Sequence, residues 1–456
     1  MSEIIREIEA DFRKELEAYN TPETPAVNLL DEIKQKFLDM KLTIGDKTIP
    51  TFIKPYFMTK ERMDYVRYAQ NTMMTVIEKI VRLYDTEPET RPWFRLNDAE
   101  IELAEIDRGW RRVVWITRND AFMTDDWLKF IEFNTDSPGG PMYSDAQTRL
   151  VEETPVMQKV LSRWETSHDE FIPQVLDCLI TAYRGWGGSK EKPNIAIVGG
   201  RGSATLPEFL KIIEWFRERG YNAEFTDPRD VEYDGKHCLA NGMPIDVAYR
   251  RGWIKDWTDH MDEIRPLLKG YAEGKVCVVN PPHSVLGANK SLMEVFQRPE
   301  VQKKLYTDDE IKVIADCVPW TRLMEKGKTD YRGEPVDDVW EFARKNREKL
   351  ILKPFDQYGG RDVCIGPHVS ESEWDQWLEK AARSLYVLQE YVKIPEEEFP
   401  VVEPEYRWMP KKINVNFFAY NGIHAGGMVR TSDSPVINIS AGGGLTPILI
   451  VHGKKS

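Results

Sequence analysis

The sequence has little cysteine and histidine and no long apolar run. Its five cysteines are spread over 456 residues without a C-x-x-C pair, which argues for reduced thiols and against a disulfide framework or a zinc site. The seven histidines are dispersed and form no H-E-x-x-H motif. No apolar stretch approaches the roughly 20 residues that cross a bilayer. These absences argue against a disulfide-rich secreted domain, a zinc enzyme and a membrane-spanning protein.

The chain also lacks an excess of positive charge. Its formal net charge of −13 at pH 7 argues against nucleic acid as the main partner. The first residues, MSEIIREIEADFRKELEA, are acidic and typical of a helix, unlike a secretory signal or a transit peptide. The length is sufficient for two or three compact lobes. We therefore expect a cytoplasmic globular protein without nucleic-acid or membrane partners.

The predicted elements change in character along the chain. Residues 1–110 are mostly helical, with apolar residues at helical spacing over 60–85, and a further helix is predicted over 145–166. Strands then alternate with helices, which implies a parallel sheet. These strands are predicted at 195–200, 222–227, 245–252 and 275–282, and the helices at 205–220 and 260–274.

Beyond residue 285 the predicted strands neighbour one another more often, which favours an α+β arrangement. The predicted helices are at 288–297, 337–349 and 372–384, and the predicted strands at 350–356, 362–366 and 386–392, with a hairpin over 412–433; the segment 437–451 closes the chain. The whole chain is thus predicted to have a mixed α/β and α+β fold.

A polar hairpin between residues 113 and 134 carries the most specific pattern. Side chains alternate along a strand, so Arg118 and Asp120 share one face, as do Glu132 and Asn134 on the next strand. If even residues pair with even ones, all four project together. Mg²⁺ prefers oxygen ligands, usually one or two carboxylates together with substrate phosphates. The pattern therefore suggests a magnesium site, and the alternative is an exposed polar hairpin face.

The segment ILKPFDQYGGRDVCIG combines a strand lysine, Lys353, with a turn at Gly359 and Gly360. Glycines allow backbone N–H groups to approach an anion, and a nearby lysine supplies a compact positive charge for a phosphate. The alternative is a glycine hairpin turn with a surface lysine. Lys290, just inside the predicted helix 288–297, is a second candidate cation, or else a surface residue.

Two further segments are candidate ligand-binding positions. The strand LQEYV could border an adenine through its backbone, near Gln389, Glu390 and Val392, or could be an ordinary strand edge. The turn GGRGSA at 199–204 lies between a predicted strand and a predicted helix. Such a helix N-terminus can hold an anion. The alternative is a plain strand-to-helix turn.

The order of these segments resembles the circularly permuted ATP-grasp ligase family, the family of glutathionylspermidine synthase. The R-x-D pattern followed by E-x-N resembles the magnesium site of that family, and the LKP…GGRDV and LQEYV segments resemble its phosphate-lysine strand and adenine hinge. In ordinary ATP-grasp enzymes E-x-N follows these segments, whereas here it precedes them by more than 200 residues. The ending GGMVRTSDSPVINISAGGG resembles the C-terminal arginine strand of the family.

The resemblance implies four parts and a reaction. These are a helical N-terminal segment at 1–112, a permuted metal-binding hairpin at 113–150, an α/β (pre-ATP-grasp-like) substrate lobe at 151–285 and ATP-grasp nucleotide-binding lobes at 286–456. The implied reaction is ATP-dependent ligation of a carboxylate to an amine through an acyl phosphate, with Mg²⁺. The family also allows a homodimer. The identities of the acid and the amine are left open.

The resemblance assigns a role to each candidate residue. It implies that Mg²⁺ is held by Asp120, Glu132 and Asn134, and that Arg118 and Arg430 bear on the transferring phosphoryl group. The implied ATP-binding residues are Lys290, Lys353, Gly359, Gly360, Gln389, Glu390 and Val392. Ser137 is a candidate for contact with a substrate because it lies next to this set.

Two other functions stay open. One is a catalytically silent nucleotide-binding protein of the same fold. The other is a dinucleotide-dependent oxidoreductase, because Gly200 and Gly202 follow a predicted strand and Glu224 lies about twenty residues further on. Thr205 stands where the third glycine of G-x-G-x-x-G belongs, which weakens the second alternative.

Overall fold

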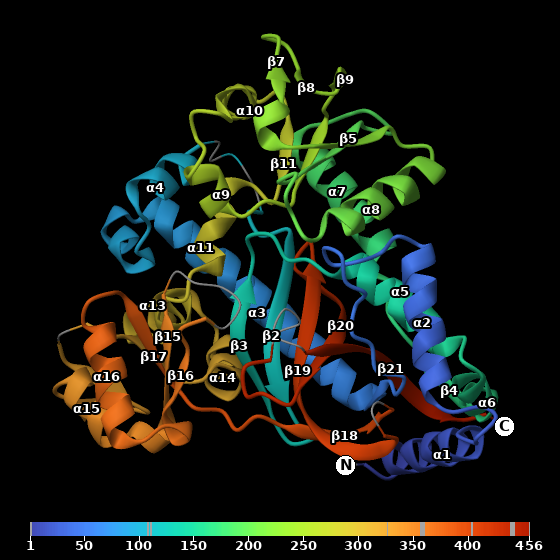
Figure 1. Cartoon of the computed structure of the whole chain (residues 1–456). Helices are drawn as coiled ribbons and strands as arrows, with labels where there is room; N and C mark the ends of the chain where they lie inside the picture. Colours follow the sequence, from blue (N-terminus) through green and yellow to red (C-terminus); the bar gives the residue numbers. More distant parts are fainter. Residues whose placement is uncertain are drawn as a thin grey trace.

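A mixed sheet forms the centre of the molecule in a computed structural model that describes residues 2–106, 109, 112–325, 327–355, 361–402, 405–437 and 443–455. Its strand order is β1-β21-β20-β19-β2-β3, with β18 paired to β19 and β4 to β21. The strands are β1 (Tyr56–Thr59), β2 (Ile116–Met123), β3 (Leu128–Asn134), β4 (Trp164–Ser167), β18 (Glu396–Val401), β19 (Arg407–Tyr420), β20 (Ile423–Ser432) and β21 (Gly444–Lys454). Segments from the two ends of the chain therefore lie side by side in this sheet (Figure 1).

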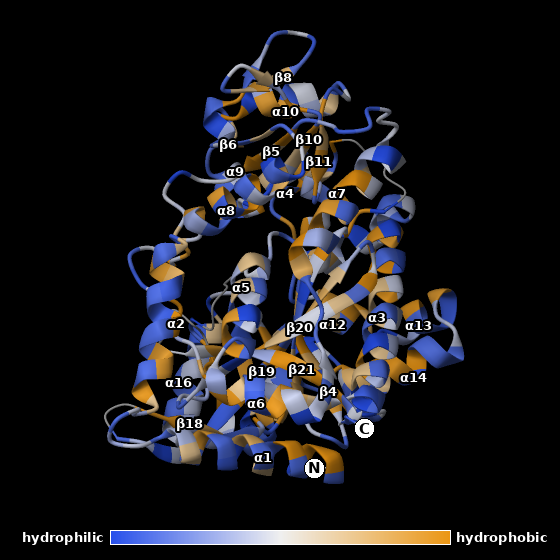
Figure 2. Cartoon of the chain, turned by 90° about the vertical axis from the view of Figure 1, so that its right-hand side faces the viewer, coloured by the Kyte–Doolittle hydropathy of each residue, from blue (hydrophilic) through white to orange (hydrophobic). Residues whose placement is uncertain are grey.

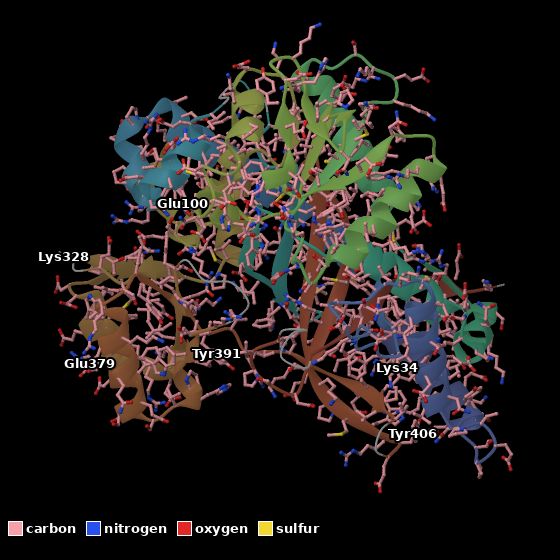
Figure 3. The ribbon with its side chains drawn as sticks, turned by 45° about the horizontal axis from the view of Figure 1, so that its top comes forward. Lys34, Glu100, Lys328, Glu379, Tyr391 and Tyr406 are labelled. Atoms are coloured by element: carbon pink, nitrogen blue, oxygen red, sulfur yellow. The ribbon has the colours of Figure 1, made fainter. Side chains whose placement is uncertain are left out.

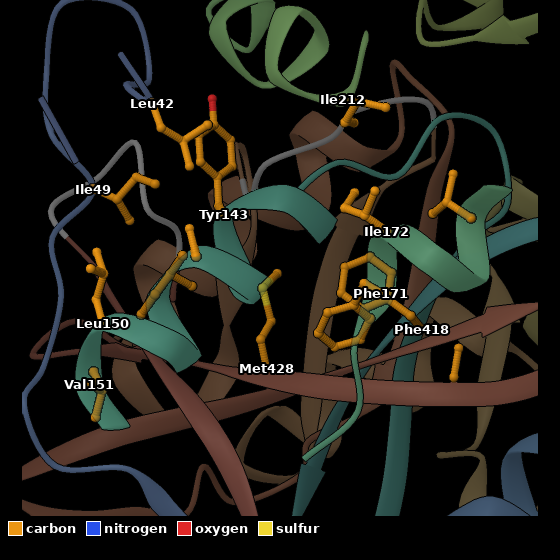
Figure 4. Close-up of a cluster of buried hydrophobic side chains, with 14 of the residues drawn as sticks. Leu42, Ile49, Tyr143, Leu150, Val151, Phe171, Ile172, Ile212, Phe418 and Met428 are labelled. Atoms are coloured by element: carbon orange, nitrogen blue, oxygen red, sulfur yellow. The ribbon is translucent and has the colours of Figure 1, made fainter. Parts of the chain in front are cut away.

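Helices cover both faces of the central sheet because its strands are apolar on both sides. Phe417 of β19 packs with the long helix α3 (Lys60–Thr86), and Gln70 of α3 donates a hydrogen bond to its carbonyl oxygen at 3.0 Å. The next residue, Phe418, faces α5 (Pro141–Glu152) and α7 (Phe171–Trp186) and contacts Phe171 at a ring separation of 4.9 Å (Figure 4). The alternation of side chains along β19 thus builds two separate cores.

The predicted parallel sheet is confirmed, and its strands run in the order β11-β10-β5-β6. These strands are β5 (Ile195–Val198), β6 (Ala223–Thr226), β10 (Val247–Arg250) and β11 (Cys277–Val279). All four residues of β5 are buried because helices lie on both of its faces. The surrounding elements are α8 (Leu206–Glu218), α9 (Ile254–Thr258), α10 (Arg265–Ala272) and the small sheet of β7 (Glu232–Tyr233), β8 (Cys238–Ala240) and β9 (Met243–Pro244).

A third, antiparallel sheet has the order β12-β17-β15-β16 and forms its own core around Trp374, Leu352 and Leu388. Its elements are β12 (Thr321–Leu323), β15 (Leu350–Pro354), β16 (Cys364–Ile365), β17 (Tyr386–Glu390), α15 (Val339–Lys345), α16 (Glu371–Ala381) and the hairpin of β13 (Thr329–Tyr331) and β14 (Glu334–Val336). Figure 3 shows Lys328 and Glu379 on the outer side of this lobe, and Tyr391 where the chain returns toward the central sheet.

The remaining helices enclose the sheets, and Figure 2 shows apolar strands inside helices with hydrophilic outer faces. They are α1 (Glu3–Tyr19), α2 (Val27–Asp39), α4 (Asp98–Ala104), α6 (Pro155–Arg163), α11 (Val285–Ala288), α12 (Leu292–Val295), α13 (Pro299–Leu305) and α14 (Asp308–Cys317). Among the described helices, none is both long enough and apolar enough to cross a membrane.

Two helix predictions are corrected by the fold. The predicted helix over 288–297 is broken between α11 and α12, because the Asn289 side chain accepts hydrogen bonds from the backbone nitrogen and hydroxyl of Ser291. The predicted helix over 145–166 is divided at Pro155, which cannot continue α5, and its last residues form β4. The mostly helical first part also contains β1, which pairs in parallel with β21 at the other end of the chain.

Candidate active site

One cavity of about 1400 Å³ lies where the three sheets meet. Its walls come from β2 and β3 and the loop after them, from the edge of the parallel sheet that includes the start of α8, and from β15, β17 and β20. Residues near position 120 and residues near position 430 therefore border the same space. The described candidate residues that line it are Arg118, Asp120, Glu132, Asn134, Ser137, Lys290, Lys353, Gln389, Glu390, Val392 and Arg430.

The register of the β2–β3 hairpin brings its polar residues to one face, because a bulge between Asp120 and Ala121 produces the pairing on which the sequence prediction depended. Arg118 is paired with Asn134 and Asp120 with Glu132, so even residues oppose even ones. On the other side of β2, the strand β19 places Asn416 opposite Asp120, and β20 places Arg430 opposite Asn414. Arg430 consequently approaches the hairpin from two strands away.

Asp120 is held between two arginines. Its carboxylate accepts a hydrogen bond from Arg118 Nε at 3.1 Å and forms an ion pair with Arg430, which also donates to Asn414 Oδ1 at 2.8 Å. Burial alone would raise the pKa of the Asp120 carboxyl, but the charges of Arg430 and Arg118 outweigh it and hold the pKa below its usual value. Asp120 therefore stays ionised and fixes both guanidinium groups at the cavity wall.

Two lysines from distant segments approach the other carboxylate. Lys290 Nζ lies 3.2 Å from Glu132 Oε1, and Lys353 Nζ donates to the carbonyl oxygen of Ile131 at 3.2 Å. Burial lowers the pKa of Lys353 to about 8; Glu132 and Asp120 oppose this shift, and Lys290 adds to it. Lys353 is thus a lysine whose charge becomes dependent on pH near neutrality.

The remaining candidate metal ligand is Asn134. Its amide nitrogen donates to the carbonyl oxygen of Arg118 at 3.0 Å, so the amide oxygen is the atom left to bind a cation. In the described part of the chain, no group of three or more His, Cys, Asp or Glu side chains is gathered to hold a metal ion. A divalent ion at this hairpin would therefore have two carboxylates and one amide from the protein, a set that suits Mg²⁺ when phosphates complete it.

The predicted adenine-binding segment lies at the end of β17. Gln389 is buried and donates to Thr321 Oγ1 at 3.0 Å, while Glu390 accepts hydrogen bonds from Tyr331 and Arg332. The strand ends at Glu390, two residues earlier than predicted, and Val392 follows at the cavity wall. Gly359 and Gly360 lie outside the described residues, so their predicted role stays a prediction.

The loop after β5 also reaches the cavity. Gly200, Gly202 and Ser203 line it, and α8 begins directly afterwards at Leu206. By contrast, Glu224 of β6 pairs with Arg217 at 2.6 Å and is not among the described cavity-lining residues. The position of Glu224 therefore gives no support to the dinucleotide-binding alternative.

Sequence reasoning missed a buried network that joins the parallel sheet to the hairpin. Arg250, whose side chain is fully buried, pairs with Asp136 and donates to the carbonyl oxygen of Asn280 at 2.9 Å. The side chain of Asn280 in turn bonds the backbone of Trp115, Ile116 and Thr135. The detectable signal was the Arg250-Arg251 pair at the end of a predicted parallel strand, since ligands bind at the carboxyl ends of such strands.

A second missed pair is formed by Glu208 and Arg251, whose side chains are both almost completely buried. Glu208 accepts a hydrogen bond from Arg251 Nη2 at 2.8 Å and two more from the backbone nitrogens of Gly140 and Met142. Within the described structure, the buried atoms Arg251 Nε, Ser137 Oγ and Arg430 Nε have no hydrogen-bond partner. All three belong to residues that line the cavity.

No protein-family model and no curated protein matches this sequence. Among solved structures, a glutathione synthetase-like effector from Globodera pallida in its apo form aligns with a TM-score of 0.63 and 14% identity, over 93% of this chain and 96% of that one. A putative γ-glutamylcysteine synthetase from Methylobacillus flagellatus KT aligns with a TM-score of 0.38 and 11% identity, over 84% and 87% of the two chains. At such identities the likeness bears on the fold alone: the chain has a mixed α/β fold similar to that of the glutathione synthetase-like effector.

Proposed function

We propose that this protein is an ATP-dependent carboxylate–amine ligase that forms an amide through an acyl phosphate and releases ADP and phosphate. The observation that carries the proposal is the shared cavity, because two of its carboxylates, one amide and four of its cationic side chains meet at the β2–β3 hairpin from segments far apart in the sequence. The four cations are Arg118, Lys290, Lys353 and Arg430, and the two carboxylates are Asp120 and Glu132. The excess of two positive charges suits a polyphosphate.

The residues fit ATP with Mg²⁺. Asp120, Glu132 and Asn134 would hold the ion, which supplies positive charge next to the phosphate oxygens when it is bound. Lys290 and Lys353 would bind the α- and β-phosphates, as lysines suit compact contacts to single oxygens. The hinge at Gln389, Glu390 and Val392 would border the adenine.

Catalysis by these residues would be mostly positioning and electrostatics, as is general for phosphoryl transfer. A substrate carboxylate attacks the γ-phosphorus and ADP leaves, and an amine then displaces phosphate from the acyl phosphate to form the amide. Arg118 and Arg430 would offset the charge on the transferring phosphoryl oxygens. Because Asp120 fixes both guanidinium groups in advance, little reorganisation is needed at the moment of transfer.

The acid substrate is placed at the end of the cavity formed by the parallel sheet. Arg251 and Ser137 line this end, and Arg251 Nε and Ser137 Oγ are buried groups that lack a partner in the described structure. A guanidinium group beside a hydroxyl favours a carboxylate. This placement puts the acid next to Arg118 and the proposed phosphate site.

A finer assignment is part of the same proposal. The E-x-N hairpin precedes the lysine strand by more than 200 residues and still shares its cavity, which supports a circularly permuted ATP-grasp fold of the glutathionylspermidine synthase type. A peptide acid and a polyamine are then the first substrates to test. Homodimer formation and a cytoplasmic location also stay predictions.

An isotope experiment tests the proposed reaction. A thermal-shift screen with Mg-ATP and candidate acids first identifies a binding acid, because a ligand at 100 times its Kd adds about 2.7 kcal/mol of stability. With that acid carrying ¹⁸O in its carboxylate, one ¹⁸O should appear in inorganic phosphate for each amide formed. Formation of AMP and pyrophosphate would refute the acyl phosphate. ATP binding without any ADP release would favour the catalytically silent alternative.

The depressed pKa of Lys353 predicts that ATP binding takes up a proton. Without ligand the amine loses its charge as pH rises through about 8, whereas the triphosphate would keep it protonated. Phosphates are already ionised in this range, since their second pKa is about 6. We expect an uptake of about half a proton at pH 8, rising toward one at pH 9, and an affinity that falls as pH rises. Calorimetry in buffers of different ionisation enthalpy measures the uptake.

Lys353→Arg is the matched control for this measurement. Arginine keeps its charge at every accessible pH, so the variant should bind ATP without taking up a proton in the same range. An equal uptake by the variant and the natural protein would show that another group titrates.

A further inference from the structure

The loop that connects β3 to α5 links the parallel sheet to Arg118. Gly139 offers its carbonyl oxygen to Arg118 Nη1 at 3.1 Å, and the next residue, Gly140, is the N-cap of α5. The backbone nitrogens of Gly140 and Met142 donate to Glu208 Oε1 at 3.0 and 3.2 Å. The carboxylate of Glu208, in the first turn of α8, therefore bonds the backbone of this loop. The loop in turn bonds Arg118 through the Gly139 carbonyl oxygen.

Close packing leaves this loop little freedom. A Cβ atom on Gly139 would lie 3.1 Å from Arg251 Nη2, and one on Gly140 would lie 3.3 Å from the Met428 methyl group. Arg251, at the end of the parallel sheet, packs against one side of the loop. Met428 of β20, two residues before Arg430, packs against the other. A methyl group at Gly139 would crowd Arg251, and the positive φ of Gly140 (114°) is one that residues with a side chain rarely adopt.

The side chains of Glu208 and Arg251 are held in place by each other and by contacts outside the loop. The Arg251 guanidinium lies over the Phe209 ring at 4.7 Å and donates to Tyr249 at 3.3 Å, in addition to its 2.8 Å bond to Glu208 Oε2. Arg251 also lines the end of the cavity to which the proposed function assigns the acid. A group bound there would contact the same pair that sets the position of the loop.

We propose that Glu208 is a positioning residue that orients Arg118 for phosphoryl transfer through the Gly139 carbonyl, and that Arg251 connects this arrangement to the acid-binding end of the cavity. The inference rests on the proposed ligase function. It predicts that Glu208 acts on kcat and only through Arg118. Glu208 itself touches neither the reacting atoms nor the proposed phosphates.

The test is a double-mutant cycle on ADP release. Glu208→Gln keeps an acceptor for the loop but loses the ion pair with Arg251, and should lower kcat at least tenfold with the KM for ATP changed less than twofold. Arg118→Lys keeps the charge but loses the Nη1 contact with Gly139. In the Arg118→Lys background, Glu208→Gln should lower kcat less than twofold further, because the contact it acts through is already absent.

Equal losses of kcat in the two backgrounds would overturn the inference, because a merely structural role acts independently of Arg118. Glu224→Gln is the matched control: the same chemical change removes an exposed 2.6 Å ion pair between β6 and α8 and should leave kcat unchanged. If Glu208→Gln does not fold, Gly139→Ala moves the loop without removing a charge. Gly139→Ala should also lower kcat and leave the KM for ATP unchanged. A kcat equal to that of the natural protein would likewise overturn the inference.

The two proposals fail in distinguishable ways. Absence of ADP release from the natural protein, with any acid and amine, refutes the ligase function before a variant is made. Turnover by the natural protein together with additive effects of Glu208 and Arg118 refutes only the positioning role.

Discussion

Replacing Glu132 by glutamine is expected to lower kcat for ADP release by at least about 100-fold while the protein stays folded. Loss of a group that merely orients a metal ligand already costs 10–100-fold, and Glu132 would be a ligand itself. Its side chain is 26% exposed, and its partner Lys290 retains access to the cavity, so the cost in stability should be small. ADP release at saturating ATP, measured over a range of Mg²⁺ concentrations, gives both kcat and the apparent Mg²⁺ requirement.

The Mg²⁺ titration separates a metal role from a purely electrostatic one. If Glu132 binds the ion, the variant should need a higher Mg²⁺ concentration for half-maximal rate. Turnover at the natural rate and natural Mg²⁺ requirement would remove Glu132 from the proposed metal site.

Asp120 is a less suitable position for this test, although it belongs to the same predicted set of metal ligands. The sequence alone suggests that Asp120→Ala would remove activity and leave the fold intact. In the structure Asp120 is 5% exposed and lies between Arg118 and Arg430, so its loss would leave two guanidinium groups facing each other in a buried place. Glu132 is therefore the cleaner test of the metal site.

The shared face within each strand of the hairpin was predictable because the alternation of side chains is a local property. The register between the two strands was left open by the sequence. Near the turn, Phe122 opposes Lys129, and a bulge between Asp120 and Ala121 shifts the pairing so that Asp120 opposes Glu132. The approach of Lys353 and Arg430 to the same cavity followed only from the order of motifs, since no local rule relates residues more than 200 positions apart.

The missed features depend on contacts between distant segments. Lys290 does not sit inside a helix, because the Asn289 side chain competes for the backbone that the helix would use. The β1–β21 pairing joins opposite ends of the chain. Glu208 looks like an ordinary surface residue of an amphipathic helix, and only the loop at Gly140 reveals its buried role. Polar residues with long-range partners are the ones that sequence periodicity misassigns.

Arg250→Met is expected to reduce the free energy of unfolding by about 3–5 kcal/mol, the cost of leaving a buried charge without its partner. The Arg250 side chain is fully buried, and its guanidinium bonds Asp136, the carbonyl oxygen of Gly252 and the hydroxyl of Ser284. Methionine would fill much of the space but would leave the Asp136 carboxylate unpaired. Urea unfolding monitored by tryptophan fluorescence measures the change in midpoint.

Two further variants separate the charge from the packing at this site. Arg265→Met removes an exposed arginine of the same lobe and should leave the midpoint nearly unchanged, since exposed ion pairs contribute little. Arg250→Met combined with Asp136→Asn removes the unpaired charge and should recover part of the lost stability. If the double variant were no more stable than Arg250→Met, the cost would lie in the lost hydrogen bonds to Asn280, Gly252 and Ser284. The packing of the parallel sheet against the hairpin would then be stabilised mainly by the hydrogen bonds of the Arg250 guanidinium to these groups, and not by its ion pair with Asp136.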